Sequence, residues 1–204
     1  MKRGGRATRA GASVVALALA VTLAACTSEN DGLVDQYRSG SNQGFIAGDG
    51  SFEEIPAERR GDPIVFQGTS VDGSQISSAD YAGRVVVLNF WYAGCGPCRA
   101  EAPLLADAYA ATQPEGADFL GVNIYDGPEQ ARSFETTYGI EYPSVLARGD
   151  ADLKLAFAAS TSLQAAPTTL VLDKQGRVAA RFIGQLREAP ILKTIVRDAL
   201  AETP

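Results

Sequence analysis

The chain has 204 residues, of which 46% are hydrophobic and 21% are charged, enough for one globular domain with a sizeable core and some extra length. It contains 24 acidic and 18 basic residues, a net charge of −6, which argues against nucleic acid as a partner. With 3 cysteines and 0 histidines, the sequence cannot complete a cage of about four cysteine and histidine ligands for zinc, so we expect no metal site.

Residues 1–25 have the pattern of a signal peptide. An apolar, small-residue run over Ala10–Ala25 follows a basic start, whose charged residues are Lys2, Arg3, Arg6 and Arg9. Such a leader is removed from the mature protein. The length of the run alone would also fit a permanent membrane anchor. Removing the leader leaves 14 basic and 24 acidic residues, so the net charge of the mature part is −10.

The end of the apolar run distinguishes a cleaved leader from a permanent anchor. The tetrapeptide Leu23–Cys26 resembles the lipobox of bacterial lipoproteins, in which the cysteine receives a lipid and becomes the first mature residue. This resemblance implies that Cys26 is a lipid anchor and not a redox residue. The protein would then be a cell-membrane lipoprotein on the extracytoplasmic face. Its attachment would come from the lipid, because the acidic mature part offers no basic patch for a membrane surface.

Residues 26–61 predict a flexible tether between the lipid and the folded domain. The segment is polar, has glycines scattered along it and shows no sustained hydrophobic period. A flexible chain of this length would hold the domain roughly 30 Å from the lipid. The alternative, an ordered strand around Gly44–Ala47, stays open.

From Asp62 the pattern becomes that of a folded domain, predicted over residues 62–204. In chain order we expect a hairpin over 64–77 with an Asp-Gly turn, a helical turn over 78–83, a strand over 85–92, a helix from the cysteine pair to about 111, a strand over 118–124, a helix over 128–138, a short strand over 143–147, a helix over 151–159, a hairpin over 168–183 and a closing helix over 189–201. Parallel strands joined through helices predict an α/β fold with a central mixed β-sheet flanked by helices on both faces.

A cysteine pair at C-x-x-C spacing, Cys95 and Cys98, lies where the apolar strand ends and a helix begins. Free backbone N–H groups and the positive end of the helix dipole favour a thiolate there. We therefore expect Cys95, at the exposed helix start, to be acidic and nucleophilic. Pro97 fits the first helical turn, where its missing N–H costs nothing. The pattern predicts a thioredoxin-like redox motif.

Two other interpretations of the cysteine pair are weaker. A c-type haem site would need a histidine after the second cysteine, where this chain has Arg99. A purely structural disulfide stays open, but the loop between Cys95 and Cys98 is too short to restrict the unfolded chain much.

The segment Trp91–Pro103 (WYAGCGPCRAEAP), followed later by Ala165–Thr169 (AAPTT), resembles the thioredoxin fold. More narrowly, the N-terminal hairpin, the glutamate after the second cysteine and the lipid anchor are similar to the TlpA/ResA-type extracytoplasmic thiol–disulfide oxidoreductases. The resemblance covers roughly residues 62–204. It implies a thioredoxin-like α/β domain with an N-terminal β-hairpin.

The resemblance also implies roles for individual residues. Cys95 would attack the substrate to form a mixed disulfide, and Cys98 would resolve it. Pro167 matches the family's cis-proline, which lies opposite the cysteines so that the backbone of Ala166 can pair with an extended substrate. Trp91 fits the core better than a contact role, but it is kept among the expected substrate-contact residues, which are Trp91, Gly94, Gly96, Pro97, Ala166 and Pro167.

Glu101 matches a glutamate that ResA-type proteins place beneath the cysteines, where it can take and return protons. The alternative, a solvated first-turn glutamate favoured by the helix dipole, stays open. The chain departs from the family at two positions. Asn89 stands where cytosolic thioredoxins carry an acidic residue, and Gly94 stands where Trp is common. The glycine would leave a flatter, less apolar rim beside the first cysteine.

The leading functional hypothesis is a membrane-tethered reductase of protein disulfides, for example in cytochrome c maturation. The Gly96-Pro97 dipeptide is that of thioredoxin, whose reduction potential is about −270 mV. Such a reductase needs a membrane-embedded thiol electron donor, and apocytochrome c is the substrate implied by the resemblance. We expect a monomer with no cofactor other than the Cys95–Cys98 disulfide. The alternatives are a disulfide-donating oxidase, a peroxiredoxin-like peroxidase, and a non-enzymatic thiol chaperone or copper carrier.

Overall fold

The computed structural model describes residues 51–161 and 166–203. The predicted leader, the predicted lipidation site at Cys26 and the alternative strand predicted at Gly44–Ala47 lie outside the described residues. Within the described ranges, no helix is both long enough and apolar enough to cross a bilayer.

A six-stranded mixed sheet forms the centre of the domain, in the order β1-β8-β7-β4-β5-β6. Strand β4 runs parallel to β5 and antiparallel to β7, and β5 runs parallel to β6. The strands are β1 (Ser51–Glu54), β4 (Val85–Trp91), β5 (Ala117–Asn123), β6 (Ser144–Leu146), β7 (Thr168–Leu172) and β8 (Val178–Ile183). Every residue of β4 is buried, as the predicted two-sided burial of this strand requires.

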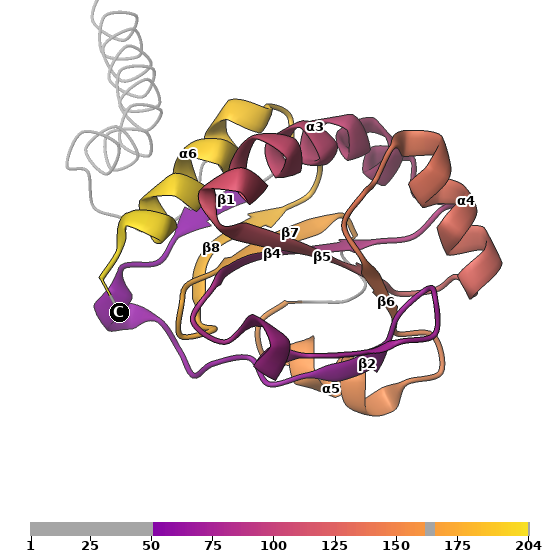
Figure 1. The fold of residues 1–204 in the computed structure, drawn as a ribbon, viewed down its shortest axis with the longest axis horizontal. Coiled ribbons are helices and arrows are strands. Elements are labelled where there is room, and N and C mark those ends of the chain that lie inside the picture. Colours follow the sequence, from indigo (N-terminus) through magenta and orange to yellow (C-terminus); the bar gives the residue numbers. More distant parts are fainter. Residues whose placement is uncertain (1–50, 162–165, 204) are drawn as a thin grey trace, which may run out of the picture. The chain divides into compact units, whose positions relative to one another are not determined.

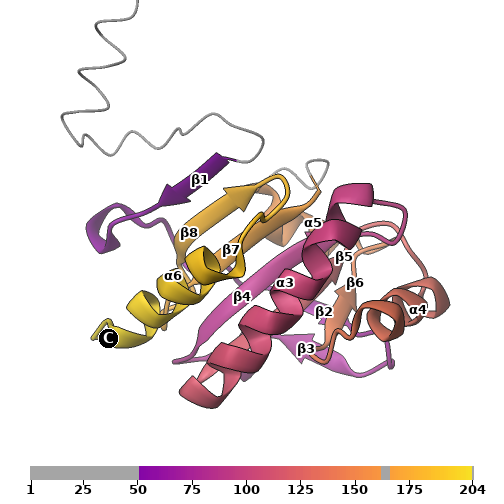
Figure 2. The same ribbon diagram turned by 90° about the horizontal axis from the view of Figure 1, so that it is seen from above.

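Helices cover both faces of this sheet, which confirms the predicted fold class (Figures 1 and 2). One face carries α3 (Gly96–Thr112) and α6 (Ala189–Ala201), and the other carries α5 (Ala151–Ala158) with the N-terminal hairpin. Helix α4 (Pro128–Tyr138) lies beside α3. Because side chains alternate along a strand, β4 feeds two cores. Val85 and Val87 pack under α3 and α6, whereas Val86, Leu88 and Phe90 pack against α5 and the hairpin.

The predicted N-terminal hairpin is present as β2 (Gln67–Thr69) and β3 (Gln75–Ser77), which pair antiparallel in a sheet of their own. Gly73 in its Asp-Gly turn has a φ of +94°, a conformation that favours glycine. Beyond β2 the chain makes a bridge from Ser70 to Val145 of β6, so the hairpin is tied to the edge of the main sheet. Three short 3-10 helices complete the fold, η1 (Ala57–Arg59), η2 (Ser78–Tyr81) and η3 (Gln113–Glu115).

The ordered domain begins earlier than the predicted boundary at residue 62. Strand β1 pairs with β8 across four residue pairs, from Ser51 with Ile183 to Glu54 with Ala180, and η1 follows it. The rings of Phe52 and Phe182 lie 4.8 Å apart between their centres. The polar sequence of β1 gives no hydrophobic period, and its partner strand lies far along the chain, so local patterning could not reveal it. At least residues 51–61 therefore do not belong to the tether.

Candidate active site

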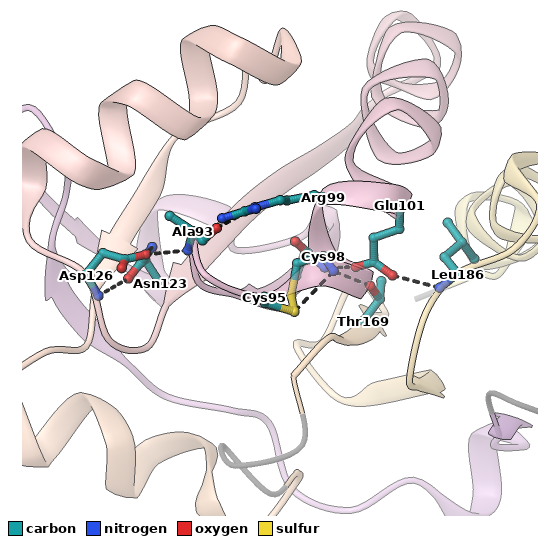
Figure 3. Close-up of a disulfide and its surroundings, with 10 residues drawn as sticks. Ala93, Cys95, Cys98, Arg99, Glu101, Asn123, Asp126, Thr169 and Leu186 are labelled. Carbon is teal, nitrogen blue, oxygen red and sulfur yellow. Dashed lines mark hydrogen bonds between the residues drawn. A yellow bond between two sulfur atoms is a disulfide. The ribbon is translucent and has the colours of Figure 1, made fainter.

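The cysteine pair lies at the junction of β4 and α3, and its two sulfurs form a disulfide (Figure 3). Cys95 is the N-cap of α3, and its backbone N–H donates to the carbonyl of Tyr92 at 3.1 Å. The backbone N–H of Cys98 donates to Sγ of Cys95 at 3.1 Å. The helix start thus aims a free N–H group at the sulfur of Cys95, as a thiolate at that position requires.

The exposure of the helix start differs from the sequence-based expectation. Gly94, Gly96 and Pro97 are exposed, but Cys95 and Cys98 are only 3% and 2% exposed. Both cysteines pack in a cluster with Val71, from the turn of the N-terminal hairpin, and with Trp91, Ala102, Ala131 and Phe134. The exposed rim of the site is therefore made by the residues flanking Cys95, and its sulfur lies just beneath them.

Glu101 lies on the buried face of α3, one turn after Cys98, and is only 1% exposed. Its Oε1 accepts a hydrogen bond from Nδ2 of Asn89 at 2.9 Å, and its Oε2 accepts from the backbone N–H of Leu186 at 2.7 Å. Burial raises the pKa of Glu101 to about 7, although the two hydrogen bonds oppose this shift. Of the two interpretations left open, the buried carboxyl group is correct and the solvated one is wrong.

Asn89, for which no role at the site was expected, holds this carboxyl group in place and is itself bound to Thr169. Asn89 points from β4 toward α3 and donates to both Glu101 and Oγ1 of Thr169, the latter at 3.1 Å. Thr169 lies directly opposite Asn89 in the β4–β7 pairing. The one available signal was the presence of an asparagine in the middle of an otherwise apolar strand. Leu186 contributes a backbone group from the loop before α6, for which the sequence offers no signal.

The segment that faces the cysteines in the family resemblance contains a cis peptide bond between Ala166 and Pro167, as the resemblance implied. Ala166 is half-buried and packs against the cluster that contains both cysteines. Pro167 precedes β7, and its carbonyl accepts a hydrogen bond from the backbone N–H of Gly184 at 2.9 Å. This end of β7 is therefore held close to the start of α3.

Trp91, an expected substrate contact, is instead a core residue. Its side chain is 3% exposed and stacks on Phe134 of α4, with ring centres 4.3 Å apart. The buried ring of Trp91 packs the end of β4 against α4, and it cannot contact a substrate without a rearrangement of the site.

The loop before Cys95 is held by a clamp that the sequence analysis missed. The backbone N–H of Ala93 donates to Oδ2 of Asp126 at 2.6 Å, and its carbonyl accepts from Nε of Arg99 at 2.7 Å (Figure 3). The same Asp126 oxygen accepts from Nδ2 of Asn123 at 2.8 Å. The carboxylate of Asp126 thus binds the N–H of Ala93, and the guanidinium group of Arg99 binds its carbonyl. These two bonds limit how the loop carrying Cys95 can move.

Comparisons with known proteins agree with this geometry. The family model of Redoxin matches residues 53–196. Over 120 residues the chain is 31% identical to the thiol-disulfide oxidoreductase ResA of Bacillus subtilis, an alignment that covers 59% of this chain and 64% of that protein, just under two thirds of its length. The corresponding ResA of Geobacillus thermodenitrificans is 29% identical over 123 residues, which cover 60% of this chain and 68% of that protein. The solved structure of a secreted thiol-disulfide isomerase from Corynebacterium glutamicum superposes with a TM-score of 0.69 and 28% identity, covering 77% of this chain and 95% of that one.

Proposed function

We propose that this chain, a thiol–disulfide oxidoreductase that belongs to the Redoxin family, reduces protein disulfides on the outer face of the cytoplasmic membrane. The observation that carries the proposal is the Cys95–Cys98 disulfide at the start of α3, with Glu101 buried on the same helix, where burial raises its pKa to about 7. A carboxyl group with that pKa can take a proton and return it near neutral pH.

The reductive cycle follows from the order of the two sulfurs. The Cys95 thiolate attacks one sulfur of the substrate disulfide, forms a mixed disulfide and releases the other substrate sulfur as a thiolate. Cys98 then loses its proton and attacks Sγ of Cys95, which closes the Cys95–Cys98 disulfide and releases the second substrate thiolate. Two electrons pass from the protein to the substrate. Glu101 takes the proton of Cys98 in the second step and returns it when the pair is reduced again.

The substrate segment lies across the exposed rim around Cys95, which is formed by Gly94, Gly96 and Pro97. An extended segment there pairs with the backbone of Ala166 beside the cis peptide bond. The substrate class implied by the resemblance is a cysteine pair of apocytochrome c. A membrane-embedded thiol protein supplies the electrons, since the compartment outside the membrane is oxidising.

The membrane attachment in this proposal rests on the lipobox-like end of the leader, Leu23–Cys26. The mature protein begins at Cys26 and carries a lipid there. Mass spectrometry of the protein extracted from membranes tests this part. An unmodified Cys26 or a retained leader would contradict it, without bearing on the redox chemistry.

The reductase activity is tested with a synthetic peptide that contains the C-x-x-C-H segment of an apocytochrome c, closed by a disulfide. The fully reduced protein should convert the peptide to its dithiol form, with equal amounts of protein disulfide formed. The test runs in both directions. Oxidation of the dithiol peptide by the disulfide form of the protein, with no reaction in the reductive direction, would contradict the proposal and support the disulfide-donating alternative.

The likeness to the secreted thiol-disulfide isomerase of Corynebacterium glutamicum favours a second candidate function, that of a disulfide isomerase. An isomerase acts from its dithiol form and is regenerated in that form when the substrate rearranges. Reactivation of a protein with scrambled disulfides, with no net oxidation of Cys95 and Cys98, would favour this candidate over the reductase.

A further inference from the structure

Two tyrosines border the loop that carries Cys95. Tyr92 follows the end of β4, and Tyr125 lies in the loop after β5. Their rings pack edge to face, with centres 5.1 Å apart and planes at 71°. Tyr92 is half-buried, whereas Tyr125 is 51% exposed and is one of the few large side chains with apolar surface open to solvent in the described part of the chain.

The ring of Tyr92 lies over Gly94, the residue immediately before Cys95. A Cβ atom placed on Gly94 would lie 3.3 Å from Cε2 of Tyr92, which is a tight contact. The aromatic ring therefore occupies the space that a side chain at position 94 would fill. The expectation of a flatter, less apolar rim at Gly94 did not include the ring of Tyr92, which adds aromatic surface beside this glycine.

The exposed ring of Tyr125 is carried by a hydrogen-bonded turn. The backbone N–H groups of Tyr125 and Asp126 both donate to Oδ1 of Asn123, at 3.2 and 2.8 Å. The carboxylate of Asp126 in turn accepts from the backbone N–H of Ala93, in the cysteine loop. One hydrogen-bonded unit thus holds both the tyrosine and the loop that carries Cys95. A large aromatic surface that is ordered before binding loses little entropy when a partner covers it.

We propose that Tyr92 and Tyr125 form the surface that contacts an apolar side chain next to the cysteine of the substrate polypeptide. The inference rests on the proposed function, because the mixed disulfide with Cys95 brings the substrate chain to this rim. Tyr125 is then a specificity-determining residue: its exposed ring selects substrates whose reactive cysteine has an apolar or aromatic neighbour. Residues of this type, amphipathic and fixed in position, dominate many binding surfaces.

The experiment uses two synthetic peptides that differ at one position, with Phe or Ser immediately before a single cysteine. Each is supplied as its mixed disulfide with glutathione, and glutathione disulfide serves as a small reference substrate with no apolar residue beside its cysteines. The second-order rate of oxidation of the reduced protein is measured for the wild type, Tyr125→Ala, Tyr125→Phe and Leu155→Ala. Leu155 is a matched exposed apolar residue, 72% exposed, on α5 across the sheet from α3.

The wild type should react about three- to tenfold faster with the Phe peptide than with the Ser peptide, the size expected for one added aromatic contact. In Tyr125→Ala this preference should vanish, while the rate with glutathione disulfide stays within about twofold of the wild type. Tyr125→Phe and Leu155→Ala should keep the preference.

A preference retained in Tyr125→Ala, or absent from the wild type, would overturn the inference. An equal loss of rate with all three disulfides in Tyr125→Ala would also overturn it, since that result means damage to the cysteine loop. A wild type that reduces none of the disulfides would instead overturn the proposed function, and this inference with it.

Discussion

The side-chain amide of Asn89 lies 2.9 Å from Oε1 of Glu101, in the buried layer between β4 and α3. The same amide nitrogen donates to Oγ1 of Thr169, so both of its hydrogens have partners. Asn89 thus fixes the carboxyl group of Glu101 without adding a charge. An acidic residue in its place would set a second carboxyl group against the first and raise the pKa of one of them further.

The raised pKa of Glu101 predicts that the oxidised protein loses stability as the pH rises. Burial raises this pKa from 4.5 to about 7 in the folded state, and unfolding restores the lower value. The contribution is therefore fully present below the unfolded pKa and is lost as the pH rises through the folded pKa. A shift of this size corresponds to about 3 kcal/mol.

Urea unfolding of the wild type and of Glu101→Gln at several pH values measures this effect. The difference in the free energy of unfolding between the two proteins should change in favour of the variant by about 3 kcal/mol from acid to mildly alkaline pH. A difference that stays constant over that range would contradict the raised pKa.

The same substitution should alter the chemistry of the cysteines. In the reduced protein, Glu101→Gln removes a group that titrates near neutral pH and is coupled to the thiols. The rate of alkylation of Cys95 against pH should lose one inflection, and the second step of the cycle should slow by about ten- to a hundredfold or more. Glu129→Gln, at an exposed position on α4, is the matched control and should leave both unchanged. Superimposable pH profiles for the wild type and Glu101→Gln would remove Glu101 from the mechanism.

The N-cap position of Cys95 predicts which sulfur forms the bond to substrate. In the reduced protein, iodoacetamide near neutral pH should label Cys95 first, because the helix start and the backbone N–H of Cys98 stabilise its thiolate. Cys98→Ser should accumulate a mixed disulfide with the substrate peptide, and Cys95→Ser should accumulate none. Faster labelling of Cys98, or trapping by the Cys95→Ser protein, would reverse the assigned roles.

Arg60 predicts a large stability effect far from the cysteines. Its side chain is 5% exposed, binds Asp173 at 2.9 Å and binds both carboxylate oxygens of Glu202, at 2.5 and 2.6 Å. Asp173 is itself only 1% exposed, and in Arg60→Ala it keeps Arg177 as a cationic partner at 2.8 Å. The loss of the charged hydrogen bonds of Arg60 should therefore destabilise the fold by about 2 kcal/mol. Urea unfolding measures this.

Arg197→Ala is the matched control for Arg60→Ala. Arg197 binds Glu115 with a similar pair of hydrogen bonds, but both side chains are well exposed. Its loss should leave the urea midpoint close to that of the wild type, because solvent screens an exposed ion pair. Equal effects of the two substitutions would contradict the structural role assigned to Arg60. The rate of Cys95 alkylation should stay the same in both variants, since Asp173 lies beyond the end of β7 that is remote from the cysteines.

The parts of the fold that were predictable from the sequence are those specified by neighbouring residues. The apolar strand β4, the proline at the start of α3 and the Asp-Gly turn of the first hairpin each depend on a short stretch of chain. Strand β1 was missed because its residues, Ser51–Glu54, become a strand only by pairing with β8, which lies more than a hundred residues later.

The candidate site likewise has features that neighbouring residues specify and features that depend on distant parts of the chain. The C-x-x-C spacing identified Cys95 and Cys98 without any knowledge of tertiary structure. The burial of Glu101 does not follow from the sequence, since helix periodicity places it on the face of Cys98 but does not say what covers that face. Part of that cover is the loop that contains Leu186, whose backbone N–H donates to the carboxyl group of Glu101 although it lies far along the chain. The contact between Tyr125 and Tyr92 likewise could not be predicted from the sequence, because it depends on how the ends of β4 and β5 are placed relative to each other.

Equilibration of the Cys95–Cys98 couple with glutathione redox buffers tests the central claim most directly. The account predicts a reducing couple, with a potential close to the value of about −270 mV for thioredoxin. The fraction of disulfide at each buffer composition, read by mass spectrometry after alkylation, gives the potential. A value above about −180 mV would contradict the reductase account and favour a protein that donates its disulfide.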